Sequence, residues 1–411
     1  MKAIVLAGGN DQIALLKLLR ERDIYTILID FNKEPIAKPF ADKHFEVSTM
    51  DYSAVVSIAK SEKVDFILTV CTDQALLIAA KASEQLGLYF PISFKMAQNL
   101  TNKKWMKQVL TEAQLPTAKY SVSSDVKNLE LDRLSFPLVF KPVDSNSSKG
   151  VIKAKSMEDV HAAFTYAKSF SRSGVVICEE FISGEEISID AFIVKSRAHL
   201  LLVSKSEKLQ GIERRDFPIH RSIAPYSLSN KLEIMLVDIL QKIADAFCII
   251  DSPLLVQAIV NEDGINIIEL SARTGGGSKY ALIEEITGFN VIQGFLKIIF
   301  HENLSIRLIQ NPRNYVMQYI YTIPGMYLGQ EGFDYCLEKK IIDNVFFYKK
   351  EGTHISGNTN SSDRIAGVLF SGKTTSELNE KIAQFDNSIK ILNDSQADIF
   401  IHGLPLLGEE S

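Results

Sequence analysis

The chain has 411 residues, of which 46% are hydrophobic and 23% are charged, and its formal net charge is -5. This length predicts two to three domains, and the dispersed charge argues against a nucleic-acid backbone as the main partner. The four cysteines are far apart and form no CxxC pair, so a disulfide framework or zinc site is disfavoured and a reducing cytoplasm is expected. The first apolar run is too short for a signal peptide, and no stretch approaches the ~20 apolar residues of a membrane span.

The first ninety residues alternate short apolar runs with segments whose apolar residues recur at helical spacing. Strand, helix, strand, helix in this order predicts a parallel sheet whose ligands lie beyond the carboxyl ends of the strands. The expected strands are 3–7, 24–29 and 66–70, and the expected helices are 11–22, 53–61 and 73–86. Thr72 and Asp73 can cap the last of these helices.

The rest of the chain predicts a mixed α/β structure. We expect helices at 102–110, 157–170 and 230–247, and strands at 137–141, 175–180, 187–194, 200–204, 254–260 and 265–270. The last two strands, joined by the turn 261–264, read as a hairpin. The polar segment 208–225 is expected to be a long functional loop. After Pro312, short strands and glycine turns lead to a helix at 377–383, which predicts a smaller third domain.

Two segments could bind phosphate. Lys141 ends an apolar strand, and the small-residue loop 144–150 exposes backbone N–H groups that can cradle an anion. This loop lacks the P-loop pattern GxxxxGK[ST]. The run 274–278 opens a helix, whose first N–H groups also favour an anion. An ordinary surface loop or hinge is the alternative for both segments, and Lys103, at the head of a helix, is by itself most simply a solvated lysine.

A second pattern suggests a nucleoside. The strand ending in Glu179, Glu180, Phe181 and Ile182 could read a base through its backbone while Phe181 and Ile182 shape the pocket. Glu186 could then accept hydrogen bonds from ribose hydroxyls. The alternative is a hairpin with solvated charges.

A third pattern suggests a divalent cation. In the predicted hairpin, Gln257 and Glu269 can lie opposite each other, and Glu269 and Ser271 share a face because strand side chains alternate. All three offer oxygen, which Mg²⁺ prefers. A carboxylate in the apolar frame 267–270 is costly to bury without a partner, and Arg273, on the same face, can hold a carboxylate or phosphate. A structural Glu269–Arg273 pair is the alternative.

Taken in order, these features resemble the ATP-grasp superfamily, in the three-domain form of biotin carboxylase, carbamoyl phosphate synthetase and carboxylate–amine ligases. The segments 41–52 and 363–367 are also similar to stretches of these proteins. The resemblance implies an α/β fold: a Rossmann-like parallel-sheet domain at 1–93, an ATP-grasp domain at 94–310 with a mobile lid at about 118–182, and a small α+β domain at 311–411. It also implies small-molecule substrates, ATP with Mg²⁺ or Mn²⁺, and a homodimer as a candidate assembly.

The family pattern assigns roles to matching positions. It places phosphate contacts at Lys103, Lys141, Ser147, Ser148 and Gly150, the adenine hinge at Glu179, Glu180 and Ile182, the ribose ligand at Glu186, the metal ligands at Gln257, Glu269 and Ser271, and the acyl-phosphate contact at Arg273. Two positions depart from the pattern. Gln257 occupies a position where Glu or Asp is usual, although carbamoyl phosphate synthetase also has a glutamine there. Ser271 occupies a position where Asn is usual. Both changes reduce the local negative charge.

The expected chemistry is attack of a carboxylate on the γ-phosphate of ATP, followed by reaction of the acyl phosphate with an amine. Lys141 and Arg273 would act by positioning and charge neutralisation. Arg214, Arg215 and His220 could contact an acidic substrate. Three alternatives stay open: a non-catalytic ATP-binding regulatory protein, a bicarbonate-activating carboxylase, and a nicotinamide-dependent oxidoreductase. The last rests on Gly8-Gly9 and Asp30, which mimic part of a dinucleotide fingerprint.

Overall fold

The computed structural model describes the whole chain except residues 147, 210–217, 310, 357–359 and 410–411. The chain forms two compact units. Unit 1 comprises Met1–Phe90, Leu202–Tyr226 and Thr274–Ser411, and unit 2 comprises Pro91–Leu201 and Ser227–Arg273. The three-domain division remains a prediction. In the described residues, no helix is long and apolar enough to cross a membrane.

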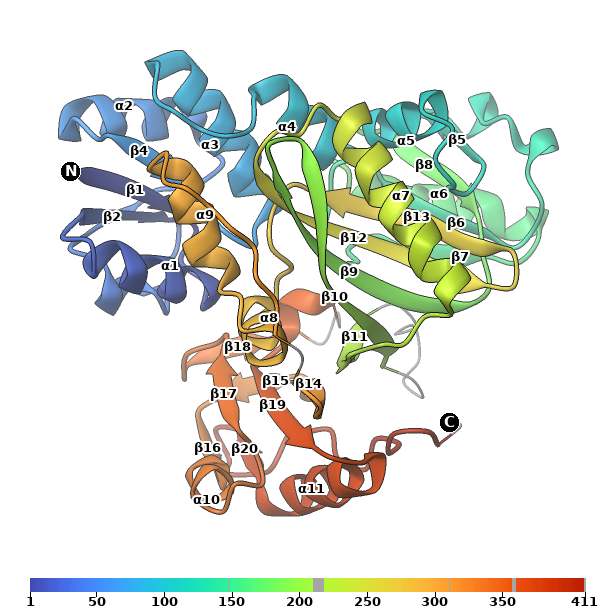
Figure 1. Cartoon of the computed structure of the whole chain (residues 1–411). Coiled ribbons are helices and arrows are strands. Elements are labelled where there is room, and N and C mark those ends of the chain that lie inside the picture. The colour runs from blue at the N-terminus through green and yellow to red at the C-terminus, as the bar shows by residue number, and fades with distance from the viewer. Residues whose placement is uncertain (147, 210–217, 310, 357–359, 410–411) are drawn as a thin grey trace. The chain divides into compact units, whose positions relative to one another are not determined.

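The N-terminal part of unit 1 is the predicted parallel sheet. Its strands are β1 (Lys2–Leu6), β2 (Tyr25–Asp30), β3 (Lys43–Glu46) and β4 (Phe66–Leu68), in the order β3-β2-β1-β4 and all parallel. Its helices are α1 (Asp11–Arg20), η1 (Lys38–Phe40), α2 (Tyr52–Glu62) and α3 (Asp73–Leu86) (Figure 1). Apolar side chains such as Ile4 and Ile27 are fully buried with α2 and α3 residues such as Val55 and Ala79. The predicted N-terminal architecture is confirmed.

The turn after β1 is held by the protein itself. The Oδ2 atom of Asp30 accepts a hydrogen bond from the Gly8 N–H at 2.7 Å, and its Oδ1 atom accepts one from the Asn32 N–H at 2.8 Å. A Cβ atom on Gly8 would lie 2.4 Å from the Cβ of Pro35. The two features that mimicked a dinucleotide fingerprint are therefore engaged by neighbouring residues, which weakens the oxidoreductase alternative.

The remainder of unit 1 is built around an antiparallel arrangement. The strands β11 (Ile219–Ala224), β14 (Asn314–Ile320), β19 (Ala366–Gly372) and β17 (Asn344–Phe347) lie in that order. Two further strand pairs are β15 (Gly325–Tyr327) with β18 (Thr353–Ile355) and β16 (Gly329–Glu331) with β20 (Lys390–Leu392). The helices are α8 (Lys279–Thr287), α9 (Val291–Ile299), α10 (Phe333–Glu338), η5 (Ser361–Asp363) and α11 (Thr375–Ser388). Phe333, Phe370 and Phe385 meet edge to face in the core.

The expectation of one long loop at 208–225 is wrong. Residues 219–224 form strand β11, which pairs with β10 (Arg197–Lys208) and β14. The polar residues that suggested a loop are buried in this strand, among them His220 and Arg221. Arg214 and Arg215 lie outside the described residues.

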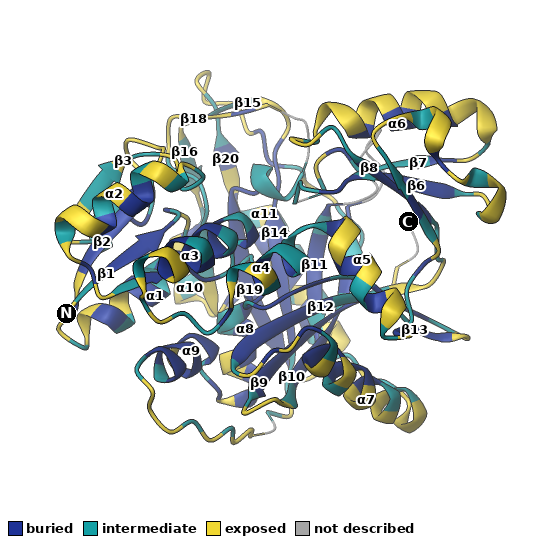
Figure 2. Ribbon diagram, turned by 90° about the horizontal axis from the view of Figure 1, so that it is seen from above, coloured by how far each residue is buried: buried dark blue, intermediate teal, exposed yellow. Residues whose placement is uncertain are grey.

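Unit 2 contains two sheets. The first has the antiparallel order β5-β8-β6-β7 and packs on α6; its elements are β5 (Tyr120–Ser123), η2 (Val126–Asn128), η3 (Leu131–Arg133), β6 (Leu138–Pro142), β7 (Ile152–Ala154), η4 (Met157–Asp159), α6 (Val160–Ser169) and β8 (Val176–Glu180). The second places β12 (Ser252–Asn261) between β13 (Gly264–Ser271) and β9 (Glu185–Val194). Strand β13 contacts the helices α4 (Phe94–Thr101), α5 (Lys103–Glu112) and α7 (Asn230–Ala246). In Figure 2, α7 is buried along one side and exposed along the other, as its apolar stripe predicts.

The predicted hairpin is confirmed with its register. Gln257 pairs with Glu269 and Leu255 pairs with Ser271, with a bulge between Gln257 and Ala258. The predicted α/β fold class, with a parallel N-terminal sheet and an antiparallel sheet following it, is confirmed as well.

Candidate active site

Lys103 is a buried lysine at the first position of α5. The Asn102 side chain caps this helix by accepting a hydrogen bond from the Lys104 N–H at 3.0 Å. The Lys103 ammonium donates to the Ser145 carbonyl oxygen at 2.8 Å and lies 3.3 Å from Oε2 of Glu269. It therefore joins the start of the small-residue loop to a carboxylate of the β12–β13 hairpin, and it is not the solvated lysine that its position alone suggested.

A second lysine–carboxylate cluster lies between α5, β6 and β8. Lys141 donates to Oε2 of Glu179 at 3.0 Å, and Lys107 lies 3.3 Å from the same oxygen. Lys107 also donates to the Thr117 hydroxyl at 2.5 Å. The other carboxylate oxygen of Glu179, Oε1, is buried and has no hydrogen-bond partner within the described residues.

Lys107 was not predicted as a site residue. It stands four residues after Lys103, so the two lysines share one face of α5, and Met106 and Leu110 are buried on the same helix. A lysine on the apolar stripe of a helix was the signal that could have identified it.

Charge and burial oppose each other in this cluster. Burial acts to raise the pKa of Glu179, but the positive charges of Lys107 and Lys141 outweigh it and lower the pKa, which keeps the carboxylate ionised. Burial also lowers the pKa of Lys107, against the attraction of Glu179. Three lysines and two glutamates (Lys103, Lys107, Lys141, Glu179 and Glu269) leave a formal surplus of one positive charge, which suits an anionic ligand.

The predicted metal ligands are brought together by the hairpin. Gln257 and Glu269 are cross-strand partners, and Ser271 follows two residues later on the face of Glu269. The Ser271 hydroxyl is buried without a hydrogen-bond partner among the described residues. The described part of the chain holds no group of three or more His, Cys, Asp or Glu side chains suited to a metal. A carboxylate, an amide oxygen and an unpaired hydroxyl nevertheless fit a hard, oxygen-seeking cation.

Arg273 lies just beyond the end of β13, two residues after Ser271. It is partly buried and belongs to unit 2 together with the metal candidates.

The small-residue loop after β6 is anchored at its start. Asp144 accepts hydrogen bonds from the Ser173 N–H at 2.8 Å, the Ser171 hydroxyl at 3.0 Å and the Arg172 N–H at 3.1 Å. Burial acts to raise its pKa, but these bonds lower it. Ser145 donates to the Phe170 carbonyl oxygen at 2.6 Å.

The end of the same loop has unusual backbone geometry. Ser148 and Gly150 both have positive φ, and a Cβ atom on Gly150 would lie 2.7 Å from the Cβ of Phe170. Ser147 lies outside the described residues. The loop thus combines a fixed start with a glycine that no other residue can replace without displacement.

The predicted adenine hinge begins with the last two residues of β8, Glu179 and Glu180. The Glu180 N–H donates to the Lys119 carbonyl oxygen at 3.0 Å, and the Phe181 N–H donates to the Pro137 carbonyl oxygen at 2.9 Å. The Lys153 ammonium lies 3.3 Å from the centre of the Phe181 ring. These contacts fix the path of the chain up to Ile182, which is partly buried.

Glu186 lies in β9 opposite Ile259 of β12. The structure therefore brings Lys103, Lys141, Glu179 and Glu269 into direct contact with one another or with the loop, and it connects Glu186 to the hairpin strand β12 by pairing.

The predicted anion site at 274–278 is wrong as stated. In unit 1, the Ser278 and Gly277 N–H groups donate to the two carboxylate oxygens of Asp11 at 2.9 and 3.2 Å. The anion at the start of α8 is thus a side chain of the protein, 266 residues away from Gly277 in the sequence. This contact holds the glycine-rich turn.

His220 and Arg364 form a buried basic cluster in unit 1. Arg364 donates to the Tyr321 hydroxyl at 2.9 Å and to the Ile219 carbonyl oxygen at 3.0 Å, and it stacks 3.6 Å from the centre of the Tyr319 ring. Burial, together with Arg221 and Arg364, lowers the pKa of His220 well below its ordinary value, so this imidazole is neutral.

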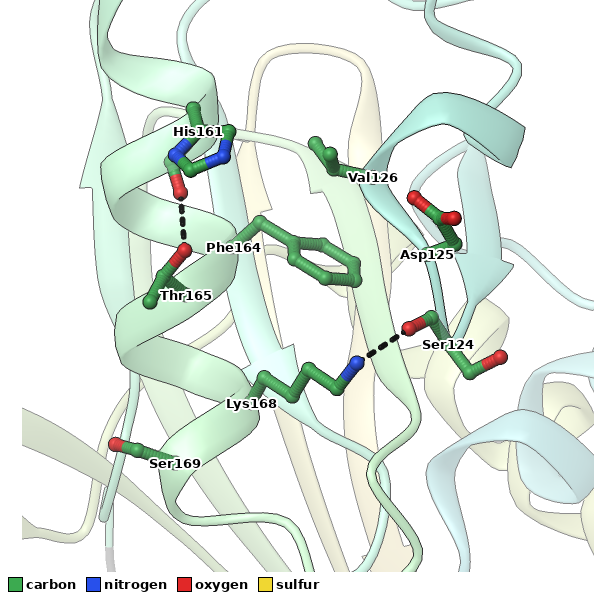
Figure 3. Close-up of a pocket in the computed structure, with 8 residues that line it drawn as sticks. All are labelled: Ser124, Asp125, Val126, His161, Phe164, Thr165, Lys168 and Ser169. Atoms are coloured by element: carbon green, nitrogen blue, oxygen red, sulfur yellow. Dashed lines mark hydrogen bonds between the residues drawn. The ribbon is translucent and has the colours of Figure 1, made fainter.

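A pocket between α6 and the segment that follows β5 contains none of the predicted site residues (Figure 3). Phe164 of α6 and Val126 of η2 face each other across it. The Lys168 side chain runs along the lower edge of the pocket in that view, and its ammonium donates to the Ser124 carbonyl oxygen at 2.7 Å. It is lined by Ser124, Asp125, Val126, His161, Phe164, Thr165, Lys168 and Ser169.

Comparisons with known proteins agree with the predicted fold. Residues 134–281 match the family described as the ATP-grasp domain. The formate-dependent phosphoribosylglycinamide formyltransferase of Methanocaldococcus jannaschii is 28% identical over 256 residues, which are 60% of this chain and 63% of that protein. The phosphoribosylamine–glycine ligase of Leptospira interrogans is 28% identical over 220 residues, 51% of each chain. The matches therefore span less than two thirds of these relatives.

Solved structures match over a longer range. The L-amino acid ligase from Bacillus licheniformis has a TM-score of 0.79 at 20% identity, covering 96% of this chain and 98% of its own. The phosphoribosylglycinamide synthetase from Anaerococcus prevotii has a TM-score of 0.75 at 20% identity, covering 96% and 99%. Residues 134–281 therefore match an ATP-grasp domain, as the motifs predicted, and nearly the whole chain shares its fold with these two solved structures.

Proposed function

We propose that this protein is an ADP-forming ligase that activates a small carboxylate with ATP and joins it to an amine. The observation that carries the proposal is the set of largely buried lysine–carboxylate contacts at Lys103–Glu269 and Lys141–Glu179, in which Glu269 and Lys141 keep some exposure. Both contacts lie beside a small-residue loop or an oxygen-rich hairpin. Such a set offers positive charge to phosphates and oxygen atoms to a metal. The names of one relative, a phosphoribosylamine–glycine ligase, and of one structural neighbour, an L-amino acid ligase, support the same reading.

The nucleotide would be held by residues of unit 2. Lys103 and Lys141 would contact the phosphates, and the loop with Ser147, Ser148 and Gly150 would close over them. Glu179, Glu180, Phe181 and Ile182 would form the adenine hinge, and Glu186 would accept from the ribose hydroxyls. Closure of the loop would exclude water, which protects a reactive acyl phosphate from hydrolysis.

Gln257, Glu269 and Ser271 would hold Mg²⁺, with Mn²⁺ as a substitute. The bound cation would neutralise phosphate charge as the γ-phosphoryl group moves. Glu269 would then exchange its contact with Lys103 for the cation, which frees Lys103 for a phosphate oxygen. The unpaired Ser271 hydroxyl would gain a partner in the same change.

The reaction has two displacements. A substrate carboxylate oxygen forms a bond to the γ-phosphorus while the bond from that phosphorus to ADP breaks. The amine nitrogen then attacks the acyl carbon, phosphate leaves, and the nitrogen loses a proton. Arg273 would hold the acyl phosphate through two parallel N–H donors, and catalysis would rest on positioning and charge neutralisation. The substrates are small molecules, and a homodimer is the assembly we propose.

The test is ADP release by the purified protein with MgATP and pools of amino acids and small carboxylic acids. We expect one pool to stimulate release and Glu269→Ala to abolish it. Glu262→Ala is the matched control, because Glu262 lies in the exposed turn of the same hairpin and should retain activity. Tight ATP binding without release in any pool would favour a non-catalytic binding protein, and stimulation by bicarbonate alone would favour a carboxylase.

A further inference from the structure

Glu179 is a buried carboxylate that two lysines share through one oxygen. Lys107 and Lys141 both approach Oε2, at 3.3 and 3.0 Å. The two lysines differ in exposure, since 1% of the Lys107 side chain is exposed against 12% of the Lys141 side chain. Only Lys141, at the end of β6, has access to a ligand beyond the cluster.

Lys107 is fixed from two sides. Its ammonium donates to the Thr117 hydroxyl, and that hydroxyl donates to the Ile267 carbonyl oxygen of β13 at 2.7 Å. Thr117 and Ile267 also form a backbone bridge. Lys107 is therefore attached to β13 two residues before Glu269, as well as to Glu179 of β8.

The proposed function creates a problem that Lys107 solves. When Lys141 turns toward a nucleotide phosphate, Glu179 loses its closer partner. A buried carboxylate without a partner is strongly destabilising, so Lys141 alone would be held in place by Glu179. A second lysine on the same oxygen removes this conflict.

We propose that Lys107 is a positioning residue that keeps Glu179 paired while Lys141 leaves it for the nucleotide. This inference rests on the proposed function, because it assigns a phosphate contact to Lys141. Lys107 does not itself touch the nucleotide. Its effect on binding is indirect and depends on the presence of the Glu179 carboxylate.

This dependence gives the test. The dissociation constant of MgATP is measured by calorimetry, without any substrate, for the protein and its Lys107→Met, Glu179→Gln and double variants. We expect Lys107→Met to weaken binding about tenfold, a coupling typical of residues in direct contact. The double variant has no buried carboxylate to retain Lys141. Its affinity for MgATP should therefore lie within about threefold of the affinity of Glu179→Gln.

Three comparisons separate the outcomes. Lys104→Met, an exposed neighbour on α5, should bind like the original protein, and Lys107→Arg should keep most of the affinity. If Lys107→Met does not fold, the neutral but polar variant Lys107→Gln, measured with and without Glu179→Gln, provides the same test. The inference is overturned if Lys107→Met binds MgATP normally, or if the losses of affinity of the two single variants multiply in the double variant.

If Lys141→Met binds MgATP normally, Lys141 does not contact a phosphate. The proposed function then loses that contact, whatever the result for Lys107.

Discussion

At the scale of single residues, two buried serines of the β12–β13 hairpin differ in their hydrogen bonds. The Ser252 hydroxyl donates to the Ala272 and Pro253 carbonyl oxygens, whereas the Ser271 hydroxyl has no partner among the described residues. Polar groups that stay unpaired after burial reduce stability unless a ligand satisfies them. Ser271 therefore has the properties of a ligand-binding residue.

The first prediction follows from this difference. Ser271→Ala should change the free energy of unfolding by less than about 1 kcal/mol, because it removes an unpaired hydroxyl. The same variant should raise the Mg²⁺ concentration needed for half-maximal ADP release several-fold. Urea denaturation and a Mg²⁺ titration measure the two effects. Ser252→Ala is the control, with an expected loss of about 1–2 kcal/mol and no change in Mg²⁺ dependence. An unchanged titration for Ser271→Ala would remove this residue from the metal site.

The second prediction concerns Gly150. Alanine at this position would combine a strained positive φ with a contact of 2.7 Å to Phe170. We expect Gly150→Ala to lose about 2 kcal/mol of stability or more and to weaken MgATP binding, because the loop must shift. Gly87→Ala has a similar φ at the end of α3 but meets no atom within 4 Å, so it should cost about 1 kcal/mol and leave binding unchanged. Equal effects of the two variants on binding would contradict the role of the loop.

At the scale of elements, His402 connects the segment after β20 to α11. Its Nε2 atom lies 2.9 Å from Oδ2 of Asp398, and its Nδ1 atom lies 3.4 Å from Oδ2 of Asp386 in α11. Burial acts to lower the pKa of His402, but the two carboxylates outweigh it and raise the pKa. The folded state therefore favours the protonated imidazole.

The third prediction is a dependence of stability on pH. Because the folded pKa lies above the ordinary value of about 6.5, the contribution of His402 is complete below that value and is lost as pH rises through the folded pKa. The effect is small, since the side chain is well exposed and solvent screens it. Urea midpoints at about pH 6 and about pH 8 should differ more for the original protein than for His402→Gln. Equal differences would show that other groups cause the change.

The extent to which the sequence predicted these elements depends on how local their causes are. The β12–β13 hairpin and the Gln257–Glu269 register follow from one turn and the alternation of strand side chains, and both are confirmed. Strand β11 was missed because its residues are polar although they are buried, and because its pairing partner β14 lies far away in the sequence.

The site shows the same limit. The motifs predicted that Lys141 and Glu179 belong to one site, but not that Lys107 shares Glu179, since only the packing of α5 turns Lys107 inward. The amides of 277 and 278 suggested an anion site, and the distant Asp11 supplies the anion. Long-range contacts of this kind leave no trace in a local pattern.

At the scale of the whole molecule, every described residue of the candidate nucleotide site belongs to unit 2. The fourth prediction is that MgATP at about 100 times its dissociation constant raises the free energy of unfolding by about 2.7 kcal/mol. It should also slow backbone hydrogen exchange in Pro91–Leu201 and Ser227–Arg273 more than in strands β1–β4. Lys141→Met provides the control, in which this slowing should be lost. Slowing confined to the parallel sheet would place the nucleotide in unit 1.

The division of the chain between the two units also sets an order of assembly on the ribosome. All residues of unit 2 have been synthesised once Arg273 is reached, whereas unit 1 takes its last segment from Thr274–Ser411. Strand β11 ends at Ala224 and its partner β14 begins at Asn314. At ordinary translation rates, the synthesis of the chain between the two strands takes roughly 5 to 20 s. In the later part of this interval, once Arg273 has been added, unit 2 is complete while one edge of β11 still has no partner to pair with. The nascent chain thus exposes an unpaired strand edge for several seconds, which is the kind of surface that chaperones protect.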